Sequence, residues 1–359
     1  MLNFTRLMLK RLFALGLSLV ALASTSAAQA SADSEVTGLS TTPLIQSLHD
    51  SRFAGVTEDL STPSLATSNL KPVRPLRNLD RTHPGYTVET IRLQWRWDDP
   101  IDLYVMRPKG VEKPPVILYL FGFPQDTDLF TNPDFQNEVT KGGFAAVCFV
   151  PALTGQRYHD RPMKEWFISE LQESLGESAH DVQMILNFLA ARGDFDMNRV
   201  GMFGLKSGGT IAILASAVDP RIKVLDVVDP WGDWPTWMAN SPFIPQEERP
   251  NYVTPDFLKK ASTLDPVDWL PKIQAKKFRF QDAVFEPVTP AKSKEKLRAA
   301  APSGTTFVFY KTDQEFEAAF PENSLDTQWI RHELNVLPGL STMASTTAPS
   351  PAESSSYKK

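Results

Sequence analysis

The sequence predicts an α/β protein: a mostly parallel, doubly wound sheet with helices on both faces. Segments typical of strands alternate along the chain with segments typical of helices. Two strand segments, Val116–Leu120 and Phe144–Val150, are continuous apolar runs, as expected for strands buried on both faces. Farther along, Asp181–Arg192 repeats apolar side chains along one helical face.

The individual elements follow from local patterns. Tyr86–Arg96 alternates apolar and polar residues, which is typical of a half-buried strand. Ser178 stands three residues before Asp181, which is the spacing of a helix-capping box, so we expect the helix to begin there. The remaining predicted elements are strand Ile101–Arg107, strand Arg199–Phe203, helix Thr210–Ala217, strands Val224–Val228 and Lys277–Phe280, helix Ala291–Ala300, strand Thr306–Tyr310 and a last helix over Leu325–Leu334.

The N-terminus has the features of a secretory signal. Three basic residues precede the apolar run Leu12–Ala23, and an Ala-Gln-Ala cleavage motif ends at Ala30. We therefore expect residues 1–30 to be a signal peptide cleaved after Ala30, and the protein to be secreted or periplasmic. Retention of the run as a membrane anchor is the alternative. No later segment is long and apolar enough to cross a bilayer, so we expect no stable span after cleavage.

The rest of the chain divides by composition. Residues 31–80 are rich in Ser, Thr, Pro and Ala, which predicts a loose leader. Residues 81–338 form the predicted domain. Residues 339–359 are of low complexity and are expected to be disordered.

Charge and cysteine content exclude several function classes. The net charge is −5, and removal of the three basic residues of the signal makes it −8. This balance argues against a nucleic-acid partner. The only cysteine, Cys148, lies in a predicted core strand, so a large core rather than a disulfide must hold the domain together. No residue cluster has metal-ligand spacing and no glycine-rich loop has phosphate-binding form, so we expect neither metal nor cofactor.

The stretch RVGMFGLKSGGT, residues 199–210, resembles the nucleophile elbow of the α/β-hydrolases. That motif is a strand, a sharp G-x-S-x-G turn and a helix. Gly204, Gly208 and Gly209 occupy its small-residue positions. Residues 85–110, 194–204 and 261–273 are similar to segments of the dienelactone hydrolase and acetyl xylan esterase branch. The resemblance implies an α/β-hydrolase fold over residues 81–335.

The same resemblance implies a degenerate catalytic triad. Alignment of the glycines puts Lys206 at the nucleophile position. The acid position falls on Glu286, with Asp282 as the fallback, and the base position falls on Gln314. Glutamine cannot take and release a proton near neutral pH, and a protonated lysine is no nucleophile. The backbone N–H groups of Phe123 and Ser207 could still form an oxyanion hole.

Two further residues are candidates for the missing roles. Asp229 follows a predicted strand and is an alternative acid position, but it has no histidine to orient. His159 is the only histidine that the predicted topology brings near the crevice, and a surface-loop role is the simpler interpretation.

Three uses of this site remain open. Lys206 and Glu286 could form an ion pair that fills the old site, so that the protein binds rather than cleaves. Ser207 could act as a displaced nucleophile, although the residue after the apex points its side chain elsewhere. Lys206 could itself attack a carbonyl, as Schiff-base lysines do, although a neighbouring Glu286 favours the charged amine.

A cluster of tryptophans follows one predicted strand. Trp231 and Trp234, with Trp237, could form a platform that binds sugars or apolar ligands, or they could pack inside the domain. We therefore predict a non-catalytic or atypical protein that binds a small-molecule, carbohydrate or ester ligand in the former active-site cleft. An active carboxylic-ester hydrolase that uses Ser207 or another residue set is the alternative.

Overall fold

The computed structural model describes residue 53 and residues 55–157, 167–321 and 327–337. The chain divides into two compact units, Met1–Ala54 and Gly55–Lys359. The account below concerns the second unit. The predicted signal peptide, the first part of the leader and the predicted tail 339–359 lie outside the described residues.

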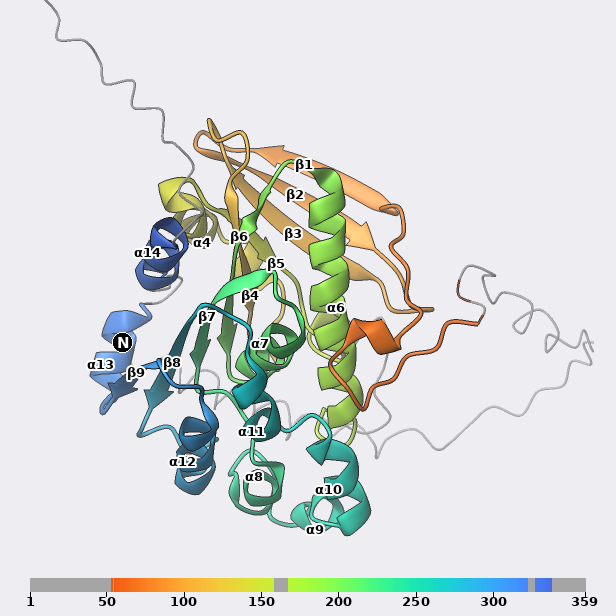
Figure 1. The fold of residues 1–359 in the computed structure, drawn as a ribbon, viewed down its shortest axis with the longest axis vertical. Coiled ribbons are helices and arrows are strands. Elements are labelled where there is room, and N and C mark those ends of the chain that lie inside the picture. Colours follow the sequence, from red (N-terminus) through yellow and green to blue (C-terminus); the bar gives the residue numbers. More distant parts are fainter. Residues whose placement is uncertain (1–52, 54, 158–166, 322–326, 338–359) are drawn as a thin grey trace, which may run out of the picture. The chain divides into compact units, whose positions relative to one another are not determined.

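The second unit is built on one nine-stranded sheet with the order β1-β2-β3-β5-β4-β6-β7-β8-β9 (Figure 1). Strands β1, β2 and β3 pair antiparallel, and β3 is also antiparallel to β5. All pairs from β5 to β9 are parallel. The strands are β1 Arg77–Thr82, β2 Tyr86–Leu93, β3 Ile101–Pro108, β4 Pro115–Leu120, β5 Ala145–Cys148, β6 Asp196–Leu205, β7 Ile222–Val228, β8 Lys277–Ala283 and β9 Thr306–Tyr310. The predicted mostly parallel sheet is confirmed.

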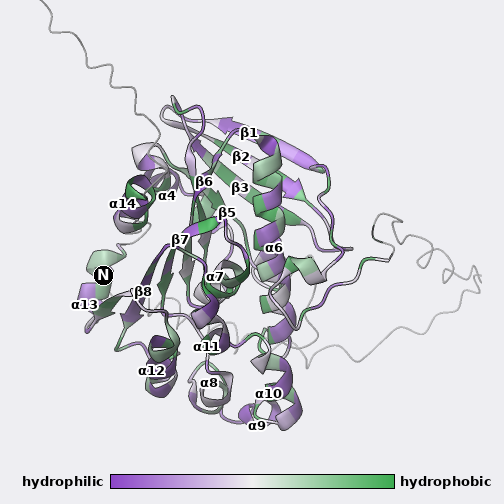
Figure 2. Ribbon diagram, viewed as in Figure 1, coloured by the Kyte–Doolittle hydropathy of each residue, from purple (hydrophilic) through white to green (hydrophobic). Residues whose placement is uncertain are grey.

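Helices cover both faces of this sheet and create two apolar cores. Strand β4 shows why its sequence is continuously apolar: Val116 and Leu118 belong to one core, while Ile117 and Tyr119 belong to the other. Figure 2 shows the central strands in green, as this double burial requires. Helices α6 Leu171–Arg192 and α7 Ser207–Val218 bound the first core, and α4 Pro133–Thr140 and α14 Gln328–Val336 bound the second.

The remaining helices are short or peripheral. Helices α8 to α11 follow β7 and precede β8 in the chain (Figure 1). The sequence patterns did not predict them. They are α8 Trp234–Asn240, α9 Arg249–Tyr252, α10 Pro255–Ser262 and α11 Pro266–Trp269; the others are α3 Asp128–Thr131, α12 Ala291–Ala300, α13 Asp313–Ala319 and the 3₁₀ turns η2 Leu65–Thr67, η3 Lys141–Gly143 and η4 Leu270–Lys272. Within the described part of the chain, no helix is both long and apolar enough to traverse a membrane.

Helix α6 begins ten residues earlier than predicted, at Leu171 rather than Asp181. Ser178 is therefore not a cap. Its hydroxyl is buried inside the helix, where it donates to the Ser174 carbonyl and accepts from the Ala152 amide at 2.9 Å. The prediction was wrong because the capping spacing arises by chance in a segment whose small residues pack against a neighbouring loop.

Residues 55–76, here called the strap, contact α6 in their first half and β2 at Leu76, and differ in this from the loose leader predicted over residues 31–80. The Leu65 amide donates to the Gln183 side chain at 2.9 Å, and the Gln183 amide donates to the Pro63 carbonyl at 2.7 Å. A Cβ on Gly176 would lie only 3.0 Å from the Leu60 carbonyl oxygen. This close approach is possible because residue 176 has no side chain. Beyond the strap, residues 77–82 form β1 instead of leader.

The strap is also anchored by a group of charged side chains beneath it. Glu58 accepts from Arg96 at 2.6 Å through each carboxylate oxygen, and its Oε1 lies 2.6 Å from His180 Nδ1. Asp181 accepts from Arg157 at 2.8 Å and from Trp95 at 2.9 Å. We call this group the Arg96 network; its members are Glu58, Arg96, Asp99, Arg157, His180 and Asp181.

Candidate functional site

The predicted elbow is present where β6 turns into α7. Lys206 occupies the turn with φ 55° and ψ −123°, a backbone conformation that costs energy for any residue with a side chain. A Cβ on Gly204 would lie 2.6 Å from the Gly208 carbonyl oxygen, and one on Gly208 would lie 2.5 Å from the Leu120 carbonyl oxygen. The strand, the turn and the helix therefore approach so closely that only glycine fits at these two positions.

The structure brings Lys206 and Glu286 together although they are distant in sequence. Lys206 Nζ lies 3.9 Å from Glu286 Oε1, and the two side chains are 25% and 9% exposed. The other carboxylate oxygen of Glu286 accepts from the Val288 amide at 3.0 Å. The lysine ammonium has three N–H donors, and no described residue accepts a hydrogen bond from it. The pair is thus close enough to attract but leaves the lysine donors unused.

Gln314, at the predicted base position, does not take part in this ion pair. It is exposed in the first turn of α13, directly after β9. Among the described residues, no hydrogen bond or ion pair joins Gln314 to Lys206 or Glu286. The three predicted triad positions are therefore represented by one ion pair and one exposed amide.

The predicted oxyanion hole has one of its donors already engaged. The Phe123 amide donates to Ser207 Oγ at 2.8 Å, and Ser207 is buried. Gly122, next to Phe123, lies against the apex, since a Cβ there would be 2.8 Å from Lys206 Cβ. The loop after β4 thus sits where an oxyanion hole would be, but the serine hydroxyl occupies the Phe123 donor.

A buried charge network lies beside the pair. Asp229, also at positive φ, accepts from the Ala283 amide at 2.8 Å and lies 3.3 Å from Lys294 Nζ. The same ammonium lies 3.0 Å from Asp282 Oδ1, and Asp282 also pairs with Arg298. Asp282, the fallback acid, is therefore held by two cations rather than offered to the site.

The pKa of Asp229 is raised to about 7. Burial is the main cause, Lys294 opposes it, and the negative charge of Glu286 adds to it. Lys294 was missed by the sequence reasoning. The available signal was its place three residues before Leu297, which puts it on the inward face of the predicted helix Ala291–Ala300.

The predicted tryptophan platform is inside the protein. Trp231 and Trp234 are fully buried, and Trp231 packs against Trp237 and Phe243 with ring centroids 5.1 and 4.9 Å away. Burial favours the packing alternative, because an indole without an exposed face offers no platform to a ligand from solvent.

The contacts of the described histidines do not include Lys206, Ser207 or Glu286. His180 is buried and lies 3.0 Å from the Thr62 carbonyl oxygen as well as 2.6 Å from Glu58. His83 stacks on Tyr86 near the start of β2, with ring centroids 4.6 Å apart, and His332 is exposed on α14. His159 lies outside the described residues. In the described ranges, no group of three or more His, Cys, Asp or Glu side chains is arranged to hold a metal ion.

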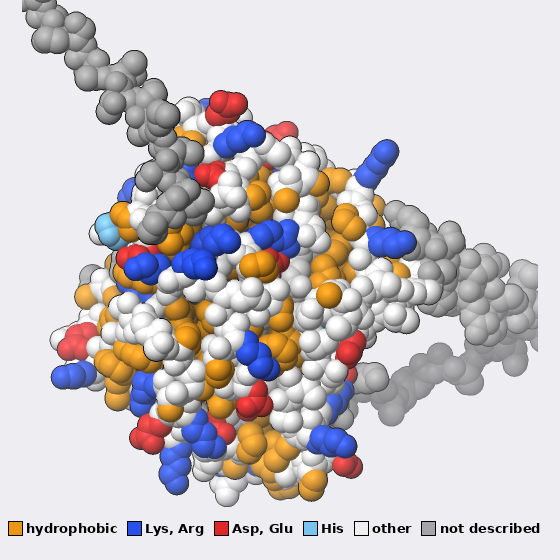
Figure 3. All heavy atoms as spheres, in the orientation of Figure 1, with side chains coloured by type: hydrophobic (Ala, Val, Ile, Leu, Met, Phe, Trp, Pro, Cys, Tyr) orange, Lys and Arg blue, Asp and Glu red, His pale blue; other side chains and the backbone are white. Residues whose placement is uncertain are grey.

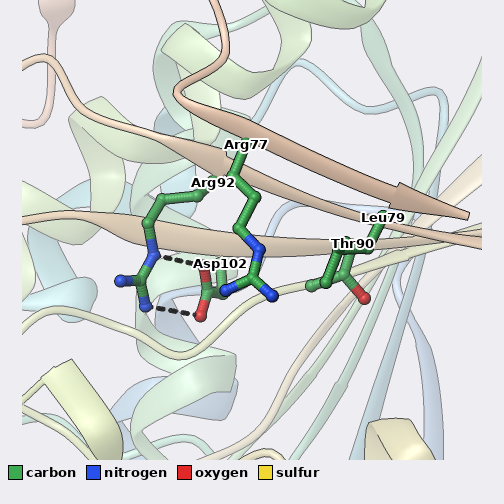
Figure 4. Close-up of a pocket in the computed structure, with 5 residues that line it drawn as sticks. All are labelled: Arg77, Leu79, Thr90, Arg92 and Asp102. Carbon is green, nitrogen blue, oxygen red and sulfur yellow. Dashed lines mark hydrogen bonds and ion pairs between the residues drawn. The ribbon is translucent and has the colours of Figure 1, made fainter.

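A separate shallow pocket lies at the other end of the sheet, on strands β1 to β3. Figure 4 shows Arg92 joined to Asp102, with Arg77 lying alongside this pair and Leu79 and Thr90 farther along the strands. Both Arg92–Asp102 hydrogen bonds measure 2.8 Å. The pocket is separated in the sheet from β6, which carries the elbow, by β5 and β4.

Comparison with known proteins agrees with this architecture. No protein-family model matches the chain. Over 152 residues, 38% of this chain, it is 25% identical to the Bacillus subtilis (strain 168) protein named "Putative hydrolase YtaP". The aligned segment spans 50% of that relative, about half of its length.

Solved structures show the same fold at low sequence identity. The acetyl xylan esterase from Paenibacillus sp. R4 superposes with a TM-score of 0.56 and 16% identity, covering 73% of this chain and 89% of the esterase. Acetyl xylan esterase 1 from Thermoanaerobacterium sp. JW/SL YS485 superposes with a TM-score of 0.54 and 15% identity, covering 66% of this chain and 82% of the esterase. The acylaminoacyl peptidase of Pyrococcus horikoshii superposes with a TM-score of 0.52 and 16% identity, covering 70% of this chain and 40% of the peptidase. Together with the sheet order and the elbow, these similarities identify an α/β-hydrolase fold.

Proposed function

We propose that this protein binds a small-molecule, carbohydrate or ester ligand at the Lys206–Glu286 site and does not hydrolyse it. One observation carries the proposal: the strained elbow backbone is kept, yet its apex carries a lysine 3.9 Å from a carboxylate. A strained backbone persists where the surrounding structure holds it in place, and it often marks a functional position. The retained geometry presents an ammonium group where a hydrolase presents a hydroxyl.

The described residues do not supply the base and the free hydroxyl that the usual route of hydrolysis needs. It requires a hydroxyl activated by a neighbouring base, which a third group orients. Of the described histidines, none has a hydrogen bond to Ser207 or Lys206, and Gln314 cannot replace a histidine. Ser207 is a poor substitute nucleophile because its hydroxyl is buried and accepts a hydrogen bond from the Phe123 amide.

The unused donors of Lys206 indicate how a ligand would be held. An ammonium group that faces only one carboxylate at 3.9 Å can donate to a carbonyl, carboxylate or hydroxyl oxygen of a ligand. The Glu286 carboxylate would repel an anionic group of the ligand and would accept a hydrogen bond from a hydroxyl group. A thermal-shift screen of such ligands against the wild type and Lys206→Gln would test this role, with stabilisation expected only in the wild type.

We also propose that the protein is secreted or periplasmic after cleavage following Ala30. Intact-mass measurement of the protein recovered from an exporting host tests this directly. A mass corresponding to residues 31–359 supports it, and a retained N-terminus in the membrane fraction contradicts it.

The proposed lack of hydrolysis is tested by labelling with a fluorophosphonate probe, followed by intact mass and peptide mapping. A known serine hydrolase labelled in parallel is the positive control. We expect no adduct on the wild type. An adduct on Ser207 would overturn the proposal and favour the alternative of an active carboxylic-ester hydrolase.

A second measurement uses the apex itself. We expect Lys206→Ser to show no turnover of p-nitrophenyl acetate above the uncatalysed rate, because none of the described histidines has a contact with the apex through which it could activate the new hydroxyl. Lys206→Ala is the matched control, since it keeps the backbone strain without a hydroxyl. Substantial turnover by Lys206→Ser alone would mean that a base is present near the apex.

A further inference from the structure

Four exposed cations stand close together in the sequence, just before and within the edge strand β1. Lys71, Arg74, Arg77 and Arg81 are all exposed and follow one another at intervals of three or four residues. We call them the cationic strip. No salt bridge is formed by any of the four with another described residue. The strip is notable because the whole chain has a net charge of −5.

Protection of a sheet edge explains only part of this arrangement. β1 is an edge strand of the sheet, and charges on edge strands discourage pairing with other chains. Edge protection does not call for exposed leucines, however. Leu76 is 48% exposed and Leu79 is 41% exposed, and both lie between the cations. The strip therefore combines exposed cations with exposed apolar side chains, which edge protection alone does not require.

The pairing of the strands shows which cation is free to bind. Arg77 lies directly opposite Arg92 in the β1–β2 register. Arg92 is held by two hydrogen bonds from its guanidinium to Asp102, each 2.8 Å long. Arg77 has no such partner and lines the same shallow pocket, with Leu79 and Thr90 (Figure 4). The pocket therefore offers one uncompensated guanidinium beside an apolar side chain and a hydroxyl.

The surroundings of the strip extend the same chemistry. Arg77, Leu79 and Arg81 alternate along β1 and so share one face of the strand. Figure 3 shows Lys and Arg side chains that project beside hydrophobic ones at the upper right, where β1 lies in Figure 1. Arginine and leucine side chains are among those that bind the interface of a lipid bilayer.

We propose that the cationic strip, with Leu76 and Leu79, docks the domain on an anionic phospholipid surface. The guanidinium groups complement the lipid phosphates in charge and geometry, and the two leucines enter the boundary between headgroups and acyl chains. A soluble polyanion would be served by the cations alone, so the exposed leucines favour a bilayer. This inference is independent of the Lys206–Glu286 site, which lies on other strands.

The test is co-sedimentation of the full chain with vesicles of phosphatidylcholine alone or with roughly a third phosphatidylglycerol. The apolar run Leu12–Ala23 and the three basic residues before it are common to all variants, so the strip is judged by the difference between variants on the same vesicles. The strip variant is Arg74→Gln/Arg77→Gln/Arg81→Gln. Its matched control, Lys259→Gln/Lys276→Gln/Lys292→Gln, removes three exposed cations from elsewhere. Thermal unfolding of each variant verifies that the fold is kept.

We expect tighter binding to the anionic vesicles, lost as salt is raised. Each neutralised arginine should weaken it about fivefold, or roughly a hundredfold for three, and the control much less. Leu76→Ser/Leu79→Ser should weaken it at least about fivefold as well. Equal loss in the strip and control variants would overturn the proposal, as would equal binding to neutral vesicles. Unchanged binding of the leucine variant, with full competition by heparin, would make the strip a site for soluble polyanions instead.

Discussion

Two groups of charged side chains in this domain are built in opposite ways. The Arg96 network is saturated: Arg157 is buried, and its hydrogen bonds to Asp99 and Asp181 are as short as 2.6 Å and 2.8 Å. The Lys206–Glu286 pair is open, with 3.9 Å between its charged atoms and a lysine that is a quarter exposed. A saturated network has no donor left for a ligand, whereas the open pair keeps its donors. The contrast separates a structural group from a binding group.

The two regions also shift the pKa of a carboxylate in opposite directions. Burial disfavours the charged form of Glu58, but the hydrogen bonds from Arg96 and His180 outweigh it and lower its pKa to about 2. Near the open pair, burial raises the pKa of Asp229 to about 7, because Lys294 compensates only in part and Glu286 adds repulsion. Glu58, which holds the strap, therefore stays ionised over a wide pH range, whereas burial disfavours the ionised form of Asp229 near the elbow.

The largest effect should follow from breaking the saturated network. Asp181→Ala removes the acceptor shared by Arg96, Arg157 and the Trp95 indole. Because two buried cations would lose a partner, we expect the free energy of unfolding to fall by about 3–5 kcal/mol. Urea denaturation measures it. Glu295→Ala, which removes an exposed carboxylate, should change stability by less than about 0.5 kcal/mol. A loss near that of the control would mean that the network is not structural.

The next effect is a pH dependence caused by Asp229. Its pKa is raised from the usual 3.8 to about 7, so between these values the folded chain binds the proton more tightly than the unfolded chain. The free energy of unfolding should therefore fall as pH rises through this window, by up to about 1.4 kcal/mol per pH unit from this group. Asp229→Asn should flatten that slope in urea titrations at several pH values.

Glu58→Gln tests the opposite case, because the stability that Glu58 contributes is fully present above its ordinary pKa of 4.5 and is lost as pH falls toward about 2. Glu58 also contacts His180, so this variant is not a neutral control at higher pH. Glu295→Ala, which removes an exposed carboxylate, is the control and should leave the slope of stability against pH between pH 5 and 7 unaltered. If Asp229→Asn and wild type have the same slope there, Asp229 is not the buried acid described above.

A smaller effect should come from relieving the elbow. Lys206→Gly allows φ 55° and ψ −123° without a side-chain clash. We expect it to raise the free energy of unfolding by about 1 kcal/mol, after the entropic cost of glycine is subtracted from the strain. Lys206→Ala keeps the strain and should be close to the wild type. Equal stability of the two variants would contradict the idea that this turn stores strain.

The smallest effect is expected from Glu286→Gln. A partly exposed pair at 3.9 Å contributes little, so stability should change by less than about 1 kcal/mol. The variant should also move the Asp229 transition to lower pH, because Glu286 is one of the groups that raise the pKa of Asp229. A loss of several kcal/mol would show that the open pair is as structural as the Arg96 network.

Much of the fold was predictable because its signals are local. Strand Thr306–Tyr310 and helix Ala291–Ala300 have the predicted bounds, since each has a regular pattern between clear end signals. The elbow was predictable from the spacing of Gly204 and Gly208, and so was the lysine at its apex. The start of α6 was not, because Ser178 is buried in the middle of that helix, against the loop that follows β5, where the sequence alone suggests a cap.

The order of the elements, the glycine-framed turn and the identity of the residue on it thus follow from the sequence alone. Which charges meet depends on how distant segments pack. Lys206 and Glu286 are 80 residues apart in the sequence, and Glu58 reaches Arg96 and His180 only because the strap folds back on α6. Apolar periodicity and turn preferences act between chain neighbours, whereas burial and ion pairing depend on packing between segments that no local pattern relates.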